Sequence, residues 1–455
     1  MKYLSTRNSS LQCSFFEILF QGLSKEGGLF LPHEWPHVDL DSLKSKSYEE
    51  VAVQIIHPFV EGDITEVDLR KIVNKSYVNF SHSKTAPVTS IEKNKYILEL
   101  FYGPTFAFKD YALQFLGNLF SHALPKASKK LTVLGATSGD TGSAAIHAFR
   151  GKKDINVFIL HPHKRVSEVQ RRQMTTVLDE NIFNVAVEGT FDDCQKIVKE
   201  LFVDDDLQQY TSLTAINSIN WARLMAQVVY YYWSYLQIDK EEINFIVPSG
   251  NFGNVFSANV AKKMGLPIQQ LHITTNQNDI LHSSIAKGLM KKNLVTQTIS
   301  PSMDIQISSN FERQLFESAN RNSDTIKDMF QEFSKTGSYT FEKSIIDNLK
   351  SIYLTTAVND QDTLSTIKLI NDKYDYLADP HTATGLSVLL DKNENEPWVS
   401  LACAHPAKFG NAIEQAIGKS PVLPKELANL FDKEEKMTIL ENNKQKLKSL
   451  ILSTL

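Results

Sequence analysis

The sequence predicts an α/β fold in which parallel sheets are covered by helices on both faces. Three observations support this prediction: short apolar runs rich in Val and Ile, helical patterns that alternate with them, and glycines at the junctions. With 455 residues, the chain is long enough for two or three domains. We expect a mixed N-terminal region over 1–95, a smaller α/β region over 96–235 and a larger one over 236–455, to which N-terminal segments contribute.

Each expected strand is an apolar, β-branched run, and the helix after it shows apolar spacing near 3.6 residues. Glycines close two of these helices, at Gly151 and Gly265. The expected strands cover 129–136, 155–162, 183–189, 244–248 and 268–276. The expected helices cover 142–151, 167–178, 190–202, 220–236 and 254–265. A further helix in 378–390 and a strand at the start of 399–410 are expected to return to the sheet.

Composition and charge argue against several classes of function. Apolar residues make up 42%, charged residues 22%, and the net charge is −4, which does not favour nucleic acid or an anionic membrane surface as a partner. Apolar runs are too short to span a bilayer, and the first twenty residues lack the apolar core of a signal peptide. The three cysteines are too widely spaced for a disulfide framework or a CxxC metal pair. We therefore expect a cytoplasmic protein with no metal centre.

One charged pair interrupts an apolar stretch in "GPTFAFKDYALQFLGNLF", which begins at Gly103. The pair is Lys109 and Asp110. A long cation is rarely buried without a partner, so Lys109 pairs with Asp110 or a glutamate, or extends its amine to solvent. Alternatively, burial removes its proton and makes the amine a nucleophile. The stretch by itself leaves both interpretations open.

Two glycine-rich loops are expected to join strands to helices, at "GATSGDTGSAA" (135–145) and "VPSGNFGNV" (247–255). Ligands of open parallel sheets bind beyond the carboxyl ends of the strands, and N–H groups at a helix start favour an anion. The first loop is neither a Walker A loop nor a GxGxxG loop, because the lysine and the spacing are missing. A tight turn that caps a helix remains an alternative for it. Together, two such loops indicate two anionic groups, or a cofactor phosphate and a substrate carboxylate.

Two further segments carry candidate ligands. "INSINWAR" places Asn217, Ser218 and Arg223 at the entry of a long helix, where they either donate to an anion or form a cap beside a surface arginine. "ACAHPAKF" follows an apolar strand, so His405 is expected at a strand end. Neither His405 nor the "HPH" pair has a second ligand at metal-binding spacing, which favours hydrogen-bonded or exposed histidines.

The combination of motifs resembles the threonine synthase family, most closely its fungal and bacterial branch with a long N-terminal region. The motifs occur in the family's order: "GPTFAFKDYALQF", "GATSGDTGSAA", "MTTV", "FDDCQKIV", "NSINWAR", "VPSGNFGNV", "AKKMGLP", "MDIQISSNFER", "DPHTATG" and "AHPAKF". They cover most of the chain. The resemblance implies a fold-type II pyridoxal-phosphate enzyme and answers the question about Lys109, which would carry the cofactor covalently.

The resemblance also implies roles for other residues. The cofactor phosphate would be held by Gly250, Asn251, Phe252, Gly253 and Asn254, while Cys403 would face the pyridine nitrogen. The substrate carboxylate and the phenolic side of the cofactor would be met by Thr137, Ser138, Gly139, Asp140 and Thr141. The substrate phosphate would be met by Asn217, Ser218 and Arg223.

The reaction implied by the family converts O-phospho-L-homoserine and water to L-threonine and phosphate, catalysed by a monomer or homodimer. Two positions depart from the family pattern, since the family usually has Thr at Cys403 and Asp at Asn254. These departures keep two alternatives open. One is a lyase that releases a 2-oxo acid and ammonia after phosphate leaves, and the other is a non-catalytic relative that retains the fold.

Overall fold

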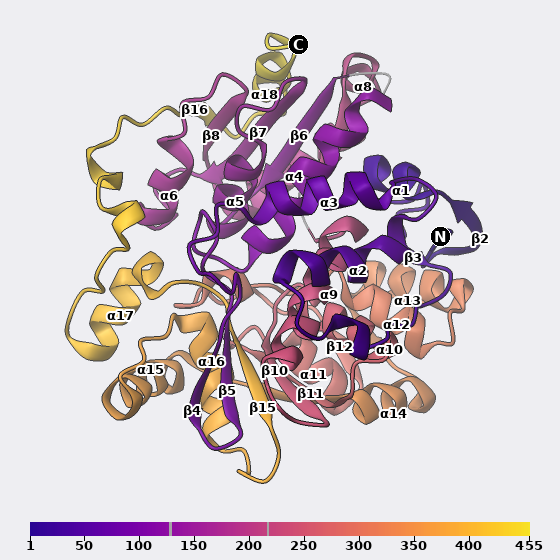
Figure 1. Ribbon diagram of the computed structural model, residues 1–455. Helices are drawn as coiled ribbons and strands as arrows, with labels where there is room; N and C mark the ends of the chain where they lie inside the picture. Colours follow the sequence, from indigo (N-terminus) through magenta and orange to yellow (C-terminus); the bar gives the residue numbers. More distant parts are fainter. Residues whose placement is uncertain (127–129, 216–217) are drawn as a thin grey trace.

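The computed structural model describes residues 1–126, 130–215 and 218–455 of the chain. Figure 1 shows a five-stranded sheet in the upper part of the molecule and a six-stranded sheet in the lower part. The upper sheet is parallel throughout. Its order is β16 (Thr438–Glu441), β8 (Ile182–Glu188), β7 (Ile155–Pro162), β6 (Leu131–Ala136) and β9 (Ser212–Ala215).

The six-stranded sheet combines segments from four distant parts of the chain. Its order is β14 (Tyr353–Ala357), β11 (Ile268–Thr275), β10 (Ile243–Pro248), β15 (Trp398–Ala402), β5 (Lys95–Glu99) and β4 (Val88–Glu92). Only the β4–β5 hairpin at its edge pairs antiparallel. The late strand β15 therefore lies between β10 and β5, so the polar residues that follow β15 reach the centre of the molecule.

The upper sheet is buried on both faces, as the near-continuous apolar strands predict. Along β7, Val157 and Ile159 join the main hydrophobic core, whereas Phe158 and Leu160 join a second cluster on the opposite face. The alternation follows from the two-residue period of a strand. The helices of this part are α4 (Lys109–Ala123), α5 (Asp140–Phe149), α6 (Glu168–Thr175), α7 (Phe191–Phe202), α8 (Asp205–Tyr210) and α18 (Lys444–Leu452).

The N-terminal region packs against the middle of the molecule. A small antiparallel sheet has the order β2 (Asn8–Cys13), β1 (Tyr3–Ser5) and β3 (Phe30–Pro32), and the helices are α1 (Phe15–Gln21), α2 (Tyr48–Val60) and α3 (Glu66–Tyr77). Ser14 and Ser47 each form a reciprocal capping box that starts α1 and α2. Helix α2 contacts α9 (Trp221–Leu236), and α3 contacts α4. Apolar side chains of α2 and α3 thereby join the same core as the two sheets.

The remaining elements surround the six-stranded sheet. The helices are α10 (Gly253–Lys263), α11 (Ile280–Lys287), α12 (Phe311–Ser318), α13 (Ser323–Thr336), α14 (Lys343–Ile352), α15 (Asp360–Tyr374), α16 (Pro380–Leu390) and α17 (Gly410–Ile417). A two-stranded antiparallel sheet pairs β12 (Leu289–Lys291) with β13 (Ser338–Thr340). Short 3-10 helices cover Asp41–Leu43, Leu124–Lys126, Pro301–Met303, Pro406–Phe409, Lys425–Leu427 and Leu430–Asp432.

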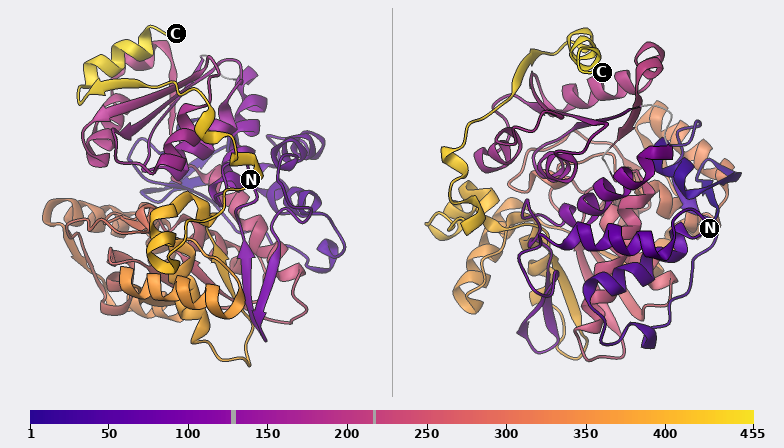
Figure 2. Two further views of the ribbon diagram at one scale, coloured as in Figure 1. Left: turned by 90° about the vertical axis from the view of Figure 1, so that its left-hand side faces the viewer. Right: turned by 45° about the horizontal axis from the view of Figure 1, so that its top comes forward.

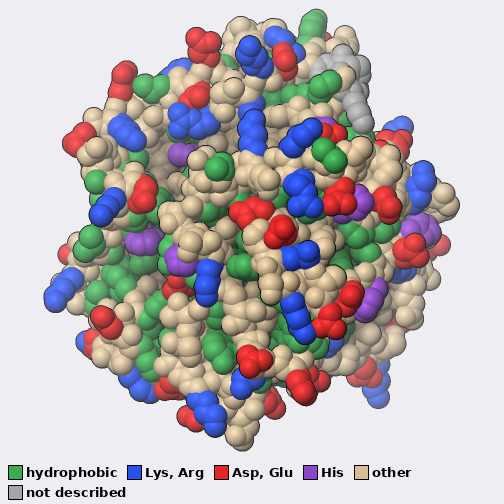
Figure 3. Space-filling view, viewed as in Figure 1, with side chains coloured by type: hydrophobic (Ala, Val, Ile, Leu, Met, Phe, Trp, Pro, Cys, Tyr) green, Lys and Arg blue, Asp and Glu red, His purple; other side chains and the backbone are tan. Residues whose placement is uncertain are grey.

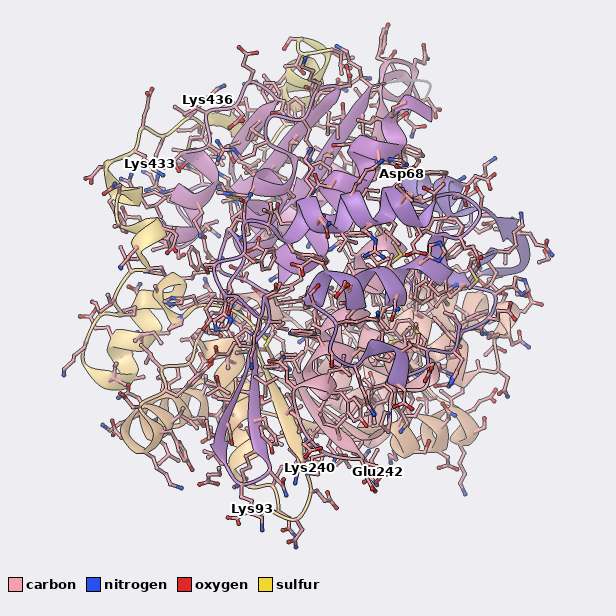
Figure 4. All side chains as sticks on the ribbon, in the orientation of Figure 1. Asp68, Lys93, Lys240, Glu242, Lys433 and Lys436 are labelled. Carbon is pink, nitrogen blue, oxygen red and sulfur yellow. The ribbon has the colours of Figure 1, made fainter. Side chains whose placement is uncertain are left out.

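The C-terminal segment returns from the lower part to the upper part, as Figures 1 and 2 show in yellow. Lys433 and Lys436 lie on its extended stretch beside α6 in Figure 4, and the Lys436 N–H donates to the Thr175 carbonyl at 2.7 Å. Glu435 forms ion pairs with Arg171 and Arg172 of α6. The chain then adds β16 to the sheet edge and packs α18 against α7. These contacts hold the end of the chain against the upper sheet.

The main strands and helices predicted from the sequence are confirmed, with boundaries shifted by a few residues. The edge strands β9 and β16 were not predicted, and α5 begins at Asp140, two residues before the expected start. The divisions at residues 95 and 235 stay a prediction. Among the described residues, none of the helices combines the length and apolarity needed to cross a bilayer. On the face shown in Figure 3, basic and acidic side chains are interspersed.

Candidate active site

The candidate site lies where the ends of β6, β10 and β15 approach the first turn of α4. The Phe108 N–H donates to the Cys403 carbonyl at 2.8 Å, and Ala107 and Ala404 form an isolated bridge. These backbone contacts fix the start of α4 beside the end of β15. Lys109, the first residue of α4, is consequently held inside the protein rather than at its surface.

The amine of Lys109 is directed to Asp140, not to the adjacent Asp110. Its Nζ lies 3.4 Å from Asp140 Oδ2 and 4.9 Å from the centroid of the Phe108 ring. Burial lowers the pKa of Lys109; the Asp140 carboxylate opposes this shift, while the Lys408 and Arg223 cations add to it. Within this site, the environment thus shifts the Lys109 amine toward its neutral, nucleophilic form.

Asp110 shapes the loop that precedes Lys109. Its carboxylate accepts hydrogen bonds from the Thr105 N–H at 2.8 Å and the Thr105 hydroxyl at 2.7 Å. A side chain at Gly103 would overlap Asp110, since a Cβ there would lie 2.4 Å from Asp110 Cβ. Burial raises the pKa of Asp110 to about 6, although the hydrogen bonds from Thr105 act against the shift. Asp110 is therefore not the partner of Lys109, which pairs with Asp140 instead.

Asp140 is the hub of the charged groups. Its Oδ1 accepts hydrogen bonds from Lys408 Nζ at 2.7 Å and Gln170 Nε2 at 2.8 Å, and its Oδ2 accepts one from Ser302 Oγ at 3.3 Å. Burial by itself raises the pKa of Asp140, but Lys408 and Lys109 outweigh that effect and hold the pKa well below its usual range. The carboxylate is therefore ionised throughout the neutral range.

The loop between β6 and α5 is held in shape by its own first residue. The Thr137 hydroxyl oxygen accepts the N–H groups of Gly139 and Gly142, each at 2.9 Å. Gly139 has a φ of +143°, and a Cβ there would lie 2.4 Å from the side-chain amide carbon of Gln170. Gln170 can thus cover the loop closely while it hydrogen bonds to Asp140. Ser138 and Thr141 remain partly exposed beside this carboxylate.

The loop between β10 and α10 relies on backbone shape. Phe252 is in the left-handed region at φ +61°, which turns the chain into α10 at Gly253. A Cβ at Gly250 would lie 3.0 Å from Ile305 Cδ1 and 3.1 Å from Met303 Cα. The same crossing segment donates the Ser308 hydroxyl to the Gly250 carbonyl at 2.7 Å. The first N–H groups of α10 point out of the helix, so this loop suits an anion.

Asn254 follows this loop and is buried against two tyrosines. Its Oδ1 accepts the hydroxyls of Tyr230 at 2.5 Å and Tyr231 at 2.7 Å. Its Nδ2 is buried and has no hydrogen-bond partner among the described residues. A buried amide donor of this kind usually has a partner, so a ligand acceptor fits the position.

A hydrogen-bonded chain supports the loop after β15. The Cys403 N–H donates to Thr382 Oγ1 at 2.8 Å, and the Thr382 hydroxyl donates to Asp379. His381 Nδ1 lies 2.8 Å from Asp379 Oδ1, and its Nε2 accepts the Ser302 N–H at 3.1 Å. Since Ser302 is the donor, the His381 ring proton lies on Nδ1. Burial raises the pKa of Cys403 well above its usual value, so its thiol stays protonated.

The predicted anion cluster is described in part. Ser218 Oγ accepts the Asn310 Nδ2 donor at 2.8 Å, and a Cβ at Gly253 would lie 3.2 Å from Ser218 Cβ. Arg223 is in the first turn of α9 and is buried, which lowers its pKa to about 10. It remains cationic at neutral pH. Asn217 lies outside the described residues.

Apart from Asn217, the structure thus brings the predicted residues of five segments to one place and adds four that sequence reasoning did not single out. The additional residues are Gln170, Ser302, His381 and Lys408. Three of them occur in or beside motifs that carried the family resemblance, "MDIQISSNFER", "DPHTATG" and "AHPAKF". Their polar type alone gave no signal, because their shared partners are distant in sequence. In the described residues, no group of three or more His, Cys, Asp or Glu side chains is arranged to hold a metal ion.

These features fit a phosphorylated aldehyde cofactor. Ser302 links a buried amine with a lowered pKa to a tightly surrounded glycine loop, because its hydroxyl contacts Asp140 and its carbonyl oxygen would lie 3.2 Å from a Cβ at Gly250. A helix begins at that loop, and an unpartnered buried amide donor follows it. The fold and the site together define a pyridoxal-phosphate-dependent enzyme of fold type II.

Comparisons with known proteins agree with this class. Family models match residues 2–77 as "Threonine synthase N terminus", 91–344 as "Pyridoxal-phosphate dependent enzyme" and 382–451 as "Threonine synthase, C-terminal". The chain is 43% identical to threonine synthase of Pseudomonas aeruginosa, over 99% of this chain and 98% of the relative. It is 42% identical to threonine synthase of Saccharomyces cerevisiae, over 96% and 95% of the two chains.

A solved structure shows the same similarity to threonine synthase. The crystal structure of pyridoxal-phosphate-bound threonine synthase from Brucella melitensis has a TM-score of 0.97 and 42% identity, covering 100% of this chain and 99% of that one. The chain belongs to the threonine synthase family.

Proposed function

We propose that this protein is a threonine synthase, which converts O-phospho-L-homoserine and water to L-threonine and phosphate. The observation that carries the proposal is the buried Lys109 amine beside Asp140, in a chain related to threonine synthases over nearly its full length. Pyridoxal phosphate, when bound, supplies a ring that withdraws electrons from bonds at the substrate α-carbon. The remaining tasks fall to residues of this chain.

Lys109 would hold the cofactor and move protons. Its amine would bind the cofactor aldehyde, and with substrate present the same amine would take and return protons at Cα and Cβ. Asp140 and Ser302 orient these groups from the side of the β6–α5 loop. The N–H groups of Gly253 and its neighbours would hold the cofactor phosphate at the start of α10, and Cys403 would lie on the side of the pyridine nitrogen.

The substrate is recognised by its two anionic groups. Residues 137–141 receive the carboxylate, and Ser218, Asn217 and Arg223 receive the phosphate. The cationic Arg223 stabilises the charge that develops when the Cγ–O bond breaks and phosphate leaves. Water then adds its oxygen to Cβ, which yields the threonine hydroxyl.

An oxygen-labelling experiment tests this assignment. Purified protein, pyridoxal phosphate and O-phospho-L-homoserine are incubated in water enriched in oxygen-18, and threonine and phosphate are quantified by mass spectrometry. We expect equal amounts of the two products, with the label in threonine and none in phosphate, because the Cγ–O bond breaks. Label in the phosphate would identify a contaminating phosphatase, and phosphate without threonine would contradict the proposal.

The same experiment addresses the second candidate, a phospho-lyase. The departures at Cys403 and Asn254 favour testing it, because both lie beside the expected cofactor. A lyase releases 2-oxobutyrate and ammonia in place of threonine. A non-catalytic relative would release neither phosphate nor 2-oxobutyrate.

The cellular setting is also part of the proposal. We place the enzyme in the cytoplasm, because Cys13, Cys194 and Cys403 are all free thiols, which suits a reducing compartment. It acts on a small-molecule substrate as a monomer or homodimer. We further propose three structural regions: an N-terminal one over 1–95, a smaller one over 96–235, and a larger one over 236–455 to which N-terminal segments contribute. The hairpin of β4 and β5 lies in the sheet of the larger region, and β16 returns to the sheet of the smaller one.

A further inference from the structure

Lys408 is a second buried lysine at the site, and no step of the proposed reaction uses it. It lies in the 3-10 helix Pro406–Phe409 with its side chain fully buried. Its Nζ is 2.7 Å from Asp140 Oδ1 and 2.8 Å from the Thr105 carbonyl oxygen. Both contacts are shorter than the 3.4 Å between Lys109 Nζ and Asp140 Oδ2. One carboxylate therefore faces two lysines at unequal distances.

A single negative charge offsets only one of two positive charges. A buried charge without a counter-charge is costly, so one of the two lysines is better accommodated without its proton. Lys408 has the closer ion pair, and a backbone carbonyl is a second acceptor for its Nζ donors. Lys109 has the longer contact and is the one whose amine must attack an aldehyde.

We propose that Lys408 is a positioning residue that occupies the Asp140 carboxylate and thereby keeps Lys109 as the free amine. The inference rests on the proposed function in one respect, namely that the enzyme uses the free Lys109 amine to bind its cofactor. The shift at Lys109 agrees with it, since Lys408 adds to the effect of burial and Asp140 opposes it. Asp140 thus has Lys408 as its structural partner and Lys109 as its reactive neighbour.

Other groups also face Lys109 and have to be held constant. Those that act on its amine from the packed elements are Phe108, Asp140, Lys408, Cys403 and Arg223. Asp110 is turned away to Thr105, and the buried Cys403 thiol stays protonated. Arg223 is the same in every variant, so its effect on Lys109 cancels when the variants are compared. A change confined to Lys408 or Asp140 therefore isolates the pair.

The test is the titration of Lys109 in the full-length chain after hydroxylamine has removed any bound aldehyde. Trace acetylation with acetic anhydride at about pH 6 to 11, followed by peptide mass spectrometry, gives the midpoint at which Lys109 loses its proton. In Lys408→Met, Asp140 is left with Lys109 alone, so we expect the midpoint to rise by about one unit, or about tenfold less free amine near neutral pH. Lys408→Arg keeps the charge and is expected to restore the wild-type midpoint.

Lys95 offers a matched control. Its buried ammonium also pairs with one carboxylate, Glu92 at 3.1 Å, and one carbonyl, Leu390 at 2.7 Å, at the far end of β5 from the site. Lys95→Met is expected to lower the melting temperature without moving the Lys109 midpoint. A Lys408→Met midpoint equal to wild type would overturn the proposal, because Lys408 would then be only structural.

Two further measurements keep the test decisive. If Lys408→Met does not fold, Asp140→Asn serves instead: with the carboxylate gone and Lys408 retained, the midpoint should fall, and an unchanged or raised midpoint overturns the proposal. Separately, borohydride reduction with pyridoxal phosphate and peptide mapping locates the cofactor. An adduct away from Lys109 would contradict the site assignment, whereas the acetylation result would still decide the role of Lys408.

Discussion

The two strand-to-helix loops at the site have similar compositions but act by different physical means. The β6–α5 loop presents a carboxylate, Asp140, to two lysines and is covered by a glutamine. The β10–α10 loop is surrounded by backbone and amide groups, and a close contact between Gly250 and the crossing segment at Met303 sets its shape. The two glycine-rich loops look alike in sequence but have different roles. The β6–α5 loop sets the charge around the two lysines, and the β10–α10 loop sets the shape of the backbone around Gly250. Ser302 connects them, because its hydroxyl reaches Asp140 while its carbonyl oxygen lies against Gly250.

The largest effect is expected from removing the Lys109 amine, which contacts Asp140 at the end of the β6–α5 loop. Lys109→Ala should abolish the borohydride-stable pyridoxyl adduct and lower kcat/KM by more than about a thousandfold, because both the attachment and the proton transfers are lost. Mass spectrometry and the threonine assay measure the two effects. Lys152→Ala is the control, since burial also lowers the pKa of Lys152, to about 8, but its amine bonds to Asn118 away from the site. An adduct that persists in Lys109→Ala would contradict the assignment.

The shape of the second loop is tested by adding one methyl group. In Gly250→Ala the new Cβ would lie 3.0 Å from Ile305 Cδ1 and 3.1 Å from the Met303 backbone. Such crowding costs about 1–3 kcal/mol, so we expect cofactor affinity to fall by about tenfold to a hundredfold. Equilibrium dialysis with pyridoxal phosphate measures this affinity. Gly410→Ala, whose nearest neighbour would be 3.9 Å away, should leave it unchanged. Equal affinities in the two variants would show that the loop tolerates a side chain.

The two buried aspartates near the β6–α5 loop, Asp110 and Asp140, are expected to change the stability of the protein differently with pH. Burial raises the pKa of Asp110 to about 6, although the hydrogen bonds from Thr105 and the charge of Lys408 act against the shift. Between the usual pKa near 4 and about 6, the folded chain binds a proton that the unfolded chain has lost, so stability falls as pH rises through this window. The shift corresponds to about 3 kcal/mol between pH 4 and 7.

Urea unfolding of wild type and Asp110→Asn at several pH values isolates this contribution. Asn carries no proton that titrates, so the wild type should lose stability relative to the variant as pH rises from about 4 to 7. Asp140 provides the contrast: its pKa is lowered, so its contribution is present at neutral pH and is lost only in strong acid. A constant difference between wild type and Asp110→Asn would mean that folding does not raise the pKa of Asp110.

How far the sequence could predict this site depends on where the partners of each residue lie. Lys109 was identified because its apolar surroundings are local, and both glycine loops were identified because glycines at strand ends leave a local pattern. Lys408 and Ser302 gave no such signal, since the carboxylate they share belongs to α5. The partner of Lys109 was also undetermined, because Asp110 is nearer in sequence than Asp140 but is bonded to Thr105. The edge strands β9 and β16 escaped prediction because short strands carry little periodicity.

The smallest effect is expected at Cys403, which belongs to neither loop. Its backbone carries the contacts that shape the site: its N–H donates to Thr382 and its carbonyl accepts from Phe108. Its buried thiol stays protonated, because burial raises its pKa, and a thiol is a weak hydrogen-bond partner. In Cys403→Ser the backbone contacts remain, so we expect kcat/KM to change by less than about tenfold.

The absorption spectrum of the bound cofactor, recorded together with the kinetics, shows whether the Cys403 thiol is required for the reaction or only adjusts the electronic properties of the cofactor. A hydroxyl donates or accepts more strongly than a thiol, so Cys403→Ser should shift the absorption maximum while threonine formation continues. Cys194→Ser is a suitable control, because that thiol is also buried but lies in the cluster behind β7 and β8. It should alter neither the spectrum nor the rate. A loss of more than about a hundredfold in Cys403→Ser alone would make the thiol a requirement of the reaction and set this enzyme apart from relatives with a hydroxyl at that position.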